Sequence, residues 1–94
     1  MQTTEATLAA LLRATNAAHG AYETRSLGGV YDQQWAAWYA RYLVAHGVGA
    51  MLGRTVTAEE VAALLAACDA TYTREQPEAS WPDFYARQLL STRG

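Results

Sequence analysis

One pair of side chains near the start of the chain could do chemistry together. His19 and Glu23 are four residues apart, so a helix would place them one turn apart on the same face. Asp32 follows a glycine-containing break, and a helical hairpin there would return it to the same end of the molecule. Imidazole and carboxylate groups of this kind can bind a metal ion or perform general acid and base catalysis.

The same residues also have a structural interpretation, which we favour. His19 would then donate a hydrogen bond to Glu23 or to a backbone carbonyl and fix the long first loop. No nucleophile and no recognised spacing of metal ligands completes the group, so we expect neither a metal nor a cofactor. If this end of the molecule does bind a ligand, the residues expected to line the site are His19, Tyr22, Glu23, Asp32, Trp35 and Tyr39.

An internal repeat indicates which elements position these residues. Residues 8–17 reappear in similar form as 61–70, and residues 35–43 reappear as 81–89, in the same order. The two copies cover residues 4–46 and 57–91, and the 94 residues leave room for a single domain. We expect an all-α fold, a four-helix bundle-like array of two helical hairpins related by a pseudo-twofold axis. The alternative is a pair of hairpins completed by dimerisation.

Hydrophobic periodicity and capping residues place the first two helices. Apolar residues three and four apart predict a helix over residues 5–23. Asp32 can cap a second helix, with an aromatic face, that ends near Gly47. Residues 47–53 contain three glycines and predict a flexible connector.

Two start signals place the helices of the second copy. Thr57 and Glu60 have the spacing of a capping box, in which each side chain bonds the backbone of the other residue. Ser80 precedes Trp81 and Pro82, so we expect a fourth helix with a serine cap and a proline in its first turn.

Positions that match between the copies are interpreted as structural. Trp35 matches Trp81, and Tyr39 matches Tyr85, so we expect all four rings to pack the core. A position that differs between the copies is a better candidate for a specialised role. His19 differs in this way, because the other copy has a tyrosine there.

Asn16 and Asp69 are matching polar positions beside the apolar face of their helices. A buried polar group needs a hydrogen-bond partner. We therefore expect each of them to accept a hydrogen bond from a tryptophan or tyrosine of the neighbouring helix.

Composition and charge exclude several classes of function. The chain has seven Arg, no Lys and a net charge of −2, which makes nucleic acid an unfavourable partner. The one cysteine, Cys68, cannot form an internal disulfide, and we expect a buried thiol. No signal peptide or membrane-spanning run is evident, so we expect no membrane association and a cytoplasmic location.

Three runs of residues carry a resemblance to other sequences. These are AHGAYE at 18–23, WAAWYARYL at 35–43 and WPDFYA at 81–86. The chain resembles a family of short, uncharacterised bacterial all-helical proteins with W-x-x-[WF]-Y-A motifs. The resemblance implies a helical fold and no particular activity.

The function that the sequence favours is a non-enzymatic interaction module. Charged residues make up only 17% of the chain, against about 25% in ordinary domains, which suggests that part of the surface is covered by another chain. A protein partner or a second copy would fit this composition. The alternative is a small-molecule binding protein or a minor enzyme with a pocket around His19, Glu23 and Asp32.

Overall fold

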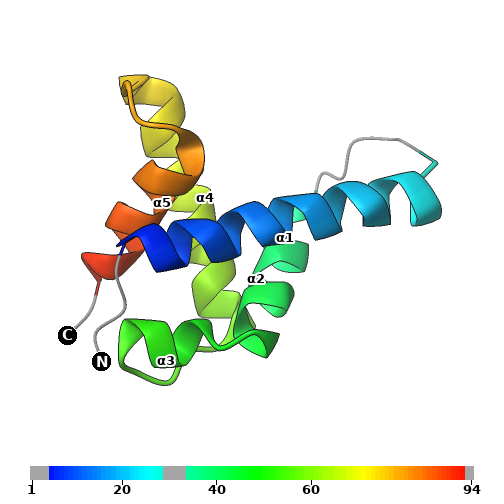
Figure 1. Cartoon of the computed structure of the whole chain (residues 1–94), viewed down its shortest axis with the longest axis horizontal. Coiled ribbons are helices and arrows are strands. Elements are labelled where there is room, and N and C mark those ends of the chain that lie inside the picture. Colours follow the sequence, from blue (N-terminus) through cyan, green and yellow to red (C-terminus); the bar gives the residue numbers. More distant parts are fainter. Residues whose placement is uncertain (1–4, 29–33, 93–94) are drawn as a thin grey trace.

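A computed structural model describes residues 5–28 and 34–92 of the chain (Figure 1). This part of the chain contains helices and no strand, so the predicted all-α fold is confirmed. Asp32 lies outside the described residues, and the cap position expected for it is held by Gln34, directly before the helix that begins at Trp35. The helices are α1 (Glu5–Ser26), α2 (Trp35–Ala45), α3 (Val48–Leu52), α4 (Ala58–Glu75) and α5 (Trp81–Leu90).

The start of α4 is fixed by the predicted capping box. The Thr57 hydroxyl oxygen accepts the backbone N–H of Glu60 at 3.1 Å, and the Glu60 carboxylate accepts the backbone N–H of Thr57 at 3.2 Å. Two N–H groups that have no partner within the helix are thereby satisfied.

Removing this cap is expected to destabilise the protein. Thr57→Ala should lower the free energy of unfolding by about 1 kcal/mol, because the Glu60 N–H loses its acceptor. Urea denaturation measures this loss. Thr55→Ala, at an exposed position outside the helix, is the control and should leave the urea midpoint unchanged. Equal midpoints for the two variants would contradict the capping role.

The start of α5 differs in one detail from the prediction. Ser80 occupies the cap position and Pro82 lies in the first turn, as expected. The Ser80 side chain, however, does not bond the helix backbone, and its hydroxyl donates to the Asp83 carboxylate at 2.8 Å. The predicted serine cap is therefore confirmed in position, but its side chain makes no hydrogen bond to the helix backbone.

The glycine-containing connector also differs from the prediction. Residues 48–52 form the short helix α3, and Gly47 and Gly53 flank it with positive φ angles of 90° and 72°. Val48 and Leu52 are both buried. Since side chains four residues apart share one helical face, a single turn of helix brings both into the core.

The core lies where two long helices each contact two others. Helix α1 packs against α2 and α5, and α4 also packs against α2 and α5 (Figure 1). The closest packing joins α2 to α4 and α1 to α5, and these are pairs from different copies of the repeat. The predicted inward faces are confirmed at the fully or nearly fully buried residues Leu8, Leu12, Leu43, Val61, Leu65, Phe84 and Leu89.

This packing determines what meets at the centre of the molecule. Because α1, α2, α4 and α5 each pack against a helix of the other copy, residues of both copies meet there. The pseudo-twofold axis remains a prediction. Such an axis requires α1 to pack on α5 as α4 packs on α2, and the observed contacts agree with this.

Candidate functional site

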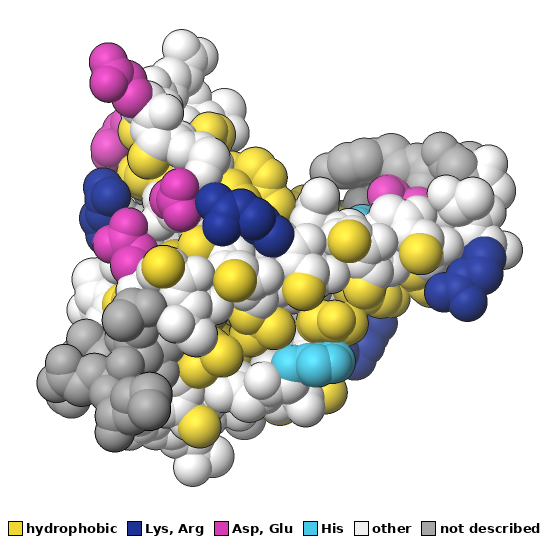
Figure 2. Space-filling view, viewed as in Figure 1, with side chains coloured by type: hydrophobic (Ala, Val, Ile, Leu, Met, Phe, Trp, Pro, Cys, Tyr) yellow, Lys and Arg dark blue, Asp and Glu magenta, His cyan; other side chains and the backbone are white. Residues whose placement is uncertain are grey.

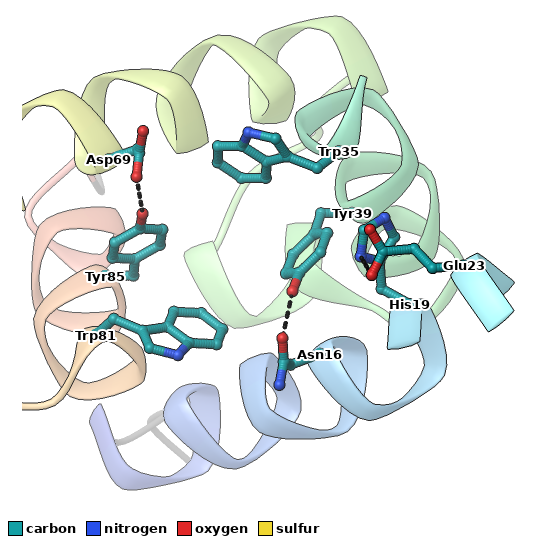
Figure 3. A pocket seen from close by; sticks show the side chains of 8 residues that line it. All are labelled: Asn16, His19, Glu23, Trp35, Tyr39, Asp69, Trp81 and Tyr85. Atoms are coloured by element: carbon teal, nitrogen blue, oxygen red, sulfur yellow. Dashed lines mark hydrogen bonds and ion pairs between the residues drawn. The ribbon is translucent and has the colours of Figure 1, made fainter. Parts of the chain in front are cut away.

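An open pocket of about 300 Å³ lies between the two copies of the repeat (Figure 3). Its walls come from α1, α2, α4 and α5. The volume is at the lower end of the range of about 300–1,000 Å³ that is usual for small-molecule sites. The lining residues are Asn16, His19, Glu23, Trp35, Tyr39, Asp69, Trp81 and Tyr85.

Four of the residues that the sequence suggested for a ligand site lie together in this pocket, namely His19, Glu23, Trp35 and Tyr39. Tyr22 lies elsewhere, with its ring stacked on that of Trp38 at a centroid distance of 5.4 Å. Asp32 lies outside the described residues.

The other half of the pocket comes from residues that we interpreted as structural. Asn16 and Asp69 each accept a tyrosine hydroxyl, from Tyr39 at 2.8 Å and from Tyr85 at 3.1 Å. The prediction that these polar positions accept hydrogen bonds from an aromatic residue of the neighbouring helix is confirmed. Each copy of the repeat therefore supplies the same tyrosine and acceptor pair to the pocket.

Four aromatic rings form a connected series along the pocket. The ring centroids of Trp35 and Tyr39 are 5.5 Å apart, and those of Trp81 and Tyr85 are 5.2 Å apart. Tyr39 and Trp81 join the two copies at 6.4 Å. Both tyrosines are buried, whereas both indoles remain partly exposed and point into the opening (Figure 3).

His19 lies at the inner side of the pocket and is only 6% exposed. Its ring is 5.0 Å from the rings of both Trp38 and Tyr39. Its Nδ1 lies 3.7 Å from Glu23 Oε1, which is within ion-pair range but too long for a hydrogen bond. The inward orientation predicted for His19 is therefore confirmed.

Glu23 reaches the pocket because α1 is longer than its counterpart. The helix continues to Ser26, three residues beyond the predicted end, whereas α4 ends at Glu75. The residue that matches Glu23 in the second copy is Gln76, which follows the end of α4 and has a left-handed conformation with φ of 47°. The extra turn of α1 keeps Glu23 one turn from His19 on the same face, and the second copy has no equivalent of this pair.

Burial and neighbouring carboxylates shift the ionisation of both pocket tyrosines. Burial, followed by the negative charge of Glu23, raises the pKa of Tyr39 to about 12. Burial, followed by the charge and hydrogen bond of Asp69, raises the pKa of Tyr85 still further. Both hydroxyls therefore stay protonated at neutral pH and serve as hydrogen-bond donors.

Nucleophilic and metal chemistry find little support in the described residues. Within residues 5–28 and 34–92, no three His, Cys, Asp or Glu side chains are placed to share a metal ion. Cys68 is buried and does not line the pocket, and burial raises the pKa of its thiol to about 11. A protonated thiol is a poor nucleophile.

Comparison with known proteins adds no further constraint. No protein-family model, no curated protein and no solved structure matches the chain. In the described part of the chain, none of the helices has the length and apolar character that crossing a bilayer requires.

Proposed function

We propose that the protein binds a small organic molecule in the pocket between the two copies of its repeat. The observation that carries this proposal is the pocket lining, in which partly exposed indoles lie beside buried tyrosines with fixed hydroxyls. A ligand that covered Trp35 and Trp81 would remove apolar ring surface from water, which favours binding. The polar side chains around it would orient the ligand.

The interaction module favoured by the sequence has weaker support. Among the described residues, Val44 is the one large apolar side chain that is exposed, at 37%. Interaction surfaces normally combine several such side chains in one patch. On the face shown in Figure 2, the apolar atoms along α1 appear as separate spots, and the exposed apolar residues of this helix are alanines. Association with a protein partner or a second copy stays a prediction, as does the cytoplasmic location.

A thermal-stability screen tests the binding proposal. Small compounds that bind the folded protein raise its melting temperature, by an amount equivalent to about 2.7 kcal/mol at a ligand concentration of 100 times Kd. We expect a subset of small polar and charged compounds to stabilise the protein in this way. Their effect should be lost in Trp81→Leu, which removes one indole from the pocket.

Trp38→Leu is the matched control for this screen. It makes the same substitution on α2, at a tryptophan that does not line the pocket, so the compounds should still stabilise this variant. Circular dichroism would check that both variants are folded. A screen without a stabilising compound, or compounds that stabilise both variants equally, would contradict the proposal.

A further inference from the structure

The inference that follows rests on the proposed function and names the class of ligand. We propose that the pocket binds a small organic ammonium cation, held against the indoles of Trp35 and Trp81 and attracted by the carboxylate of Asp69. The combination of aromatic rings with a negatively charged side chain, in an opening of this volume, carries the proposal.

The aromatic rings provide the first attraction. The face of an aromatic ring is electron-rich, and tryptophan attracts cations more strongly than the other aromatic side chains do. The indoles of Trp35 and Trp81 extend into the opening from helices on opposite sides, and the ring of Tyr39 contacts both of them from one side (Figure 3). A methylated or alkylated ammonium group suits such a site, because its carbon atoms contact the rings while its charge is attracted to them.

The carboxylate of Asp69 provides the second attraction. One of its oxygens accepts the Tyr85 hydroxyl, which orients the group toward the pocket. Within the described part of the chain, no arginine or histidine lies within ion-pair distance of Asp69. Its charge is therefore not neutralised by a basic neighbour there.

The distribution of charge favours a cation over an anion. Of the eight described residues that line the pocket, two are carboxylates, one is a histidine and none is an arginine, and the chain has no lysine. Glu23 lies on the side of the opening away from Asp69, with Tyr39 between (Figure 3). Glu23 also interacts with His19, so we assign the main charge effect to Asp69.

The repeat supplies a matched substitution for the test. Asp69→Asn gives the second copy the residue that the first copy has at Asn16. An asparagine oxygen can still accept the Tyr85 hydroxyl, as Asn16 accepts that of Tyr39. The substitution therefore removes the charge and keeps the hydrogen bond. Asn16→Asp is the reverse change and adds a charge to the pocket.

Isothermal titration calorimetry at low salt tests the proposal with choline and 3,3-dimethylbutan-1-ol. The second compound has the shape of choline but carries no charge. We expect choline to bind and its uncharged analogue to bind about tenfold more weakly, which corresponds to about 1.4 kcal/mol. Asp69→Asn should weaken choline binding about fivefold to tenfold, whereas Asn16→Asp should strengthen it. Glu59→Gln, at an exposed carboxylate of α4 outside the pocket, should change it less than about twofold.

Two results would overturn the cation proposal and leave the proposed function in place. One is equal affinity for choline and its uncharged analogue, or unchanged affinity in Asp69→Asn. The other is that choline does not bind, while other compounds raise the melting temperature of the unsubstituted protein but not that of Trp81→Leu. If neither choline nor any screened compound acts through Trp81, the proposed function fails as well.

Discussion

Leu12→Ala and Leu65→Ala are each expected to lower the free energy of unfolding by about 2–5 kcal/mol, and by similar amounts. Both side chains are completely buried, one on α1 and the other at the matching place on α4. Truncation removes the buried methyl groups and leaves a cavity that the neighbouring helices fill only in part. Domains of this size are stabilised by about 5–15 kcal/mol, so either change is a large fraction of the total.

Urea denaturation of the two variants measures these losses and compares the two copies of the repeat. Val44→Ala is the control, since this side chain is the exposed large apolar residue of the described chain and its truncation should cost less than about 1 kcal/mol. A loss for one leucine that is several times the loss for the other would contradict the equivalence of the two helices. It would indicate that one copy carries most of the core.

Alkaline pH is expected to destabilise the protein through its buried tyrosines. The pKa of Tyr39 is raised to about 12 in the folded state, while in the unfolded chain it is about 10. Above pH 10 the unfolded chain therefore loses this proton before the folded protein does, and the free energy of unfolding falls. The contribution is fully present below pH 10 and is lost as the pH rises through about 12. Tyr85 acts in the same direction.

Urea unfolding at several pH values between 9 and 12 measures this effect. The absence of lysine simplifies the experiment, because lysine would titrate in the same range. Tyr39→Phe should cost about 1 kcal/mol at neutral pH, since one hydrogen bond is lost, and its stability should then fall less steeply above pH 10. The control is Tyr42→Phe, at a partly exposed tyrosine outside the pocket. A decline in Tyr39→Phe as steep as that of the unsubstituted protein would contradict the account.

Local features of the fold could be predicted because short stretches of sequence determine them. The capping box at Thr57 and Glu60 depends on residues three positions apart, and the buried faces of α4 and α5 follow from helical spacing. The turn of helix α3 could not be predicted in the same way. Its glycines indicate a loop when the segment is considered alone, and only burial of Val48 and Leu52 against the rest of the protein favours a helix.

Half of the candidate site was missed because of how the repeat was interpreted. We took matching residues such as Trp81 and Tyr85 to be core residues only, on the reasoning that a site should occur in only one copy. That reasoning fails where the two copies meet, because equivalent residues then face one another across a shared opening. The repeat itself was the available signal, since helices that pack across the two copies bring such positions together.

His19 and Glu23 form a pair that the second copy of the repeat lacks, and the sequence shows this difference only in part. The contrast between His19 and its tyrosine counterpart Tyr72 is visible in the alignment of the two copies. The continuation of α1 to Ser26 could not be predicted from the sequence, because no strong stop signal distinguishes residue 23 from residue 26. The position of Glu23 does not depend on those last residues, because the predicted helix over residues 5–23 already placed it one turn from His19.

The central claim is that ligands bind between the two copies of the repeat, and the indole N–H signals of the three tryptophans test it most directly. A two-dimensional ¹H–¹⁵N NMR spectrum resolves these signals, and substitution of each tryptophan assigns them. Addition of a stabilising compound should move the signals of Trp35 and Trp81 and leave that of Trp38 nearly unchanged. Movement of Trp38 alone, or of none of the three, would contradict the claim.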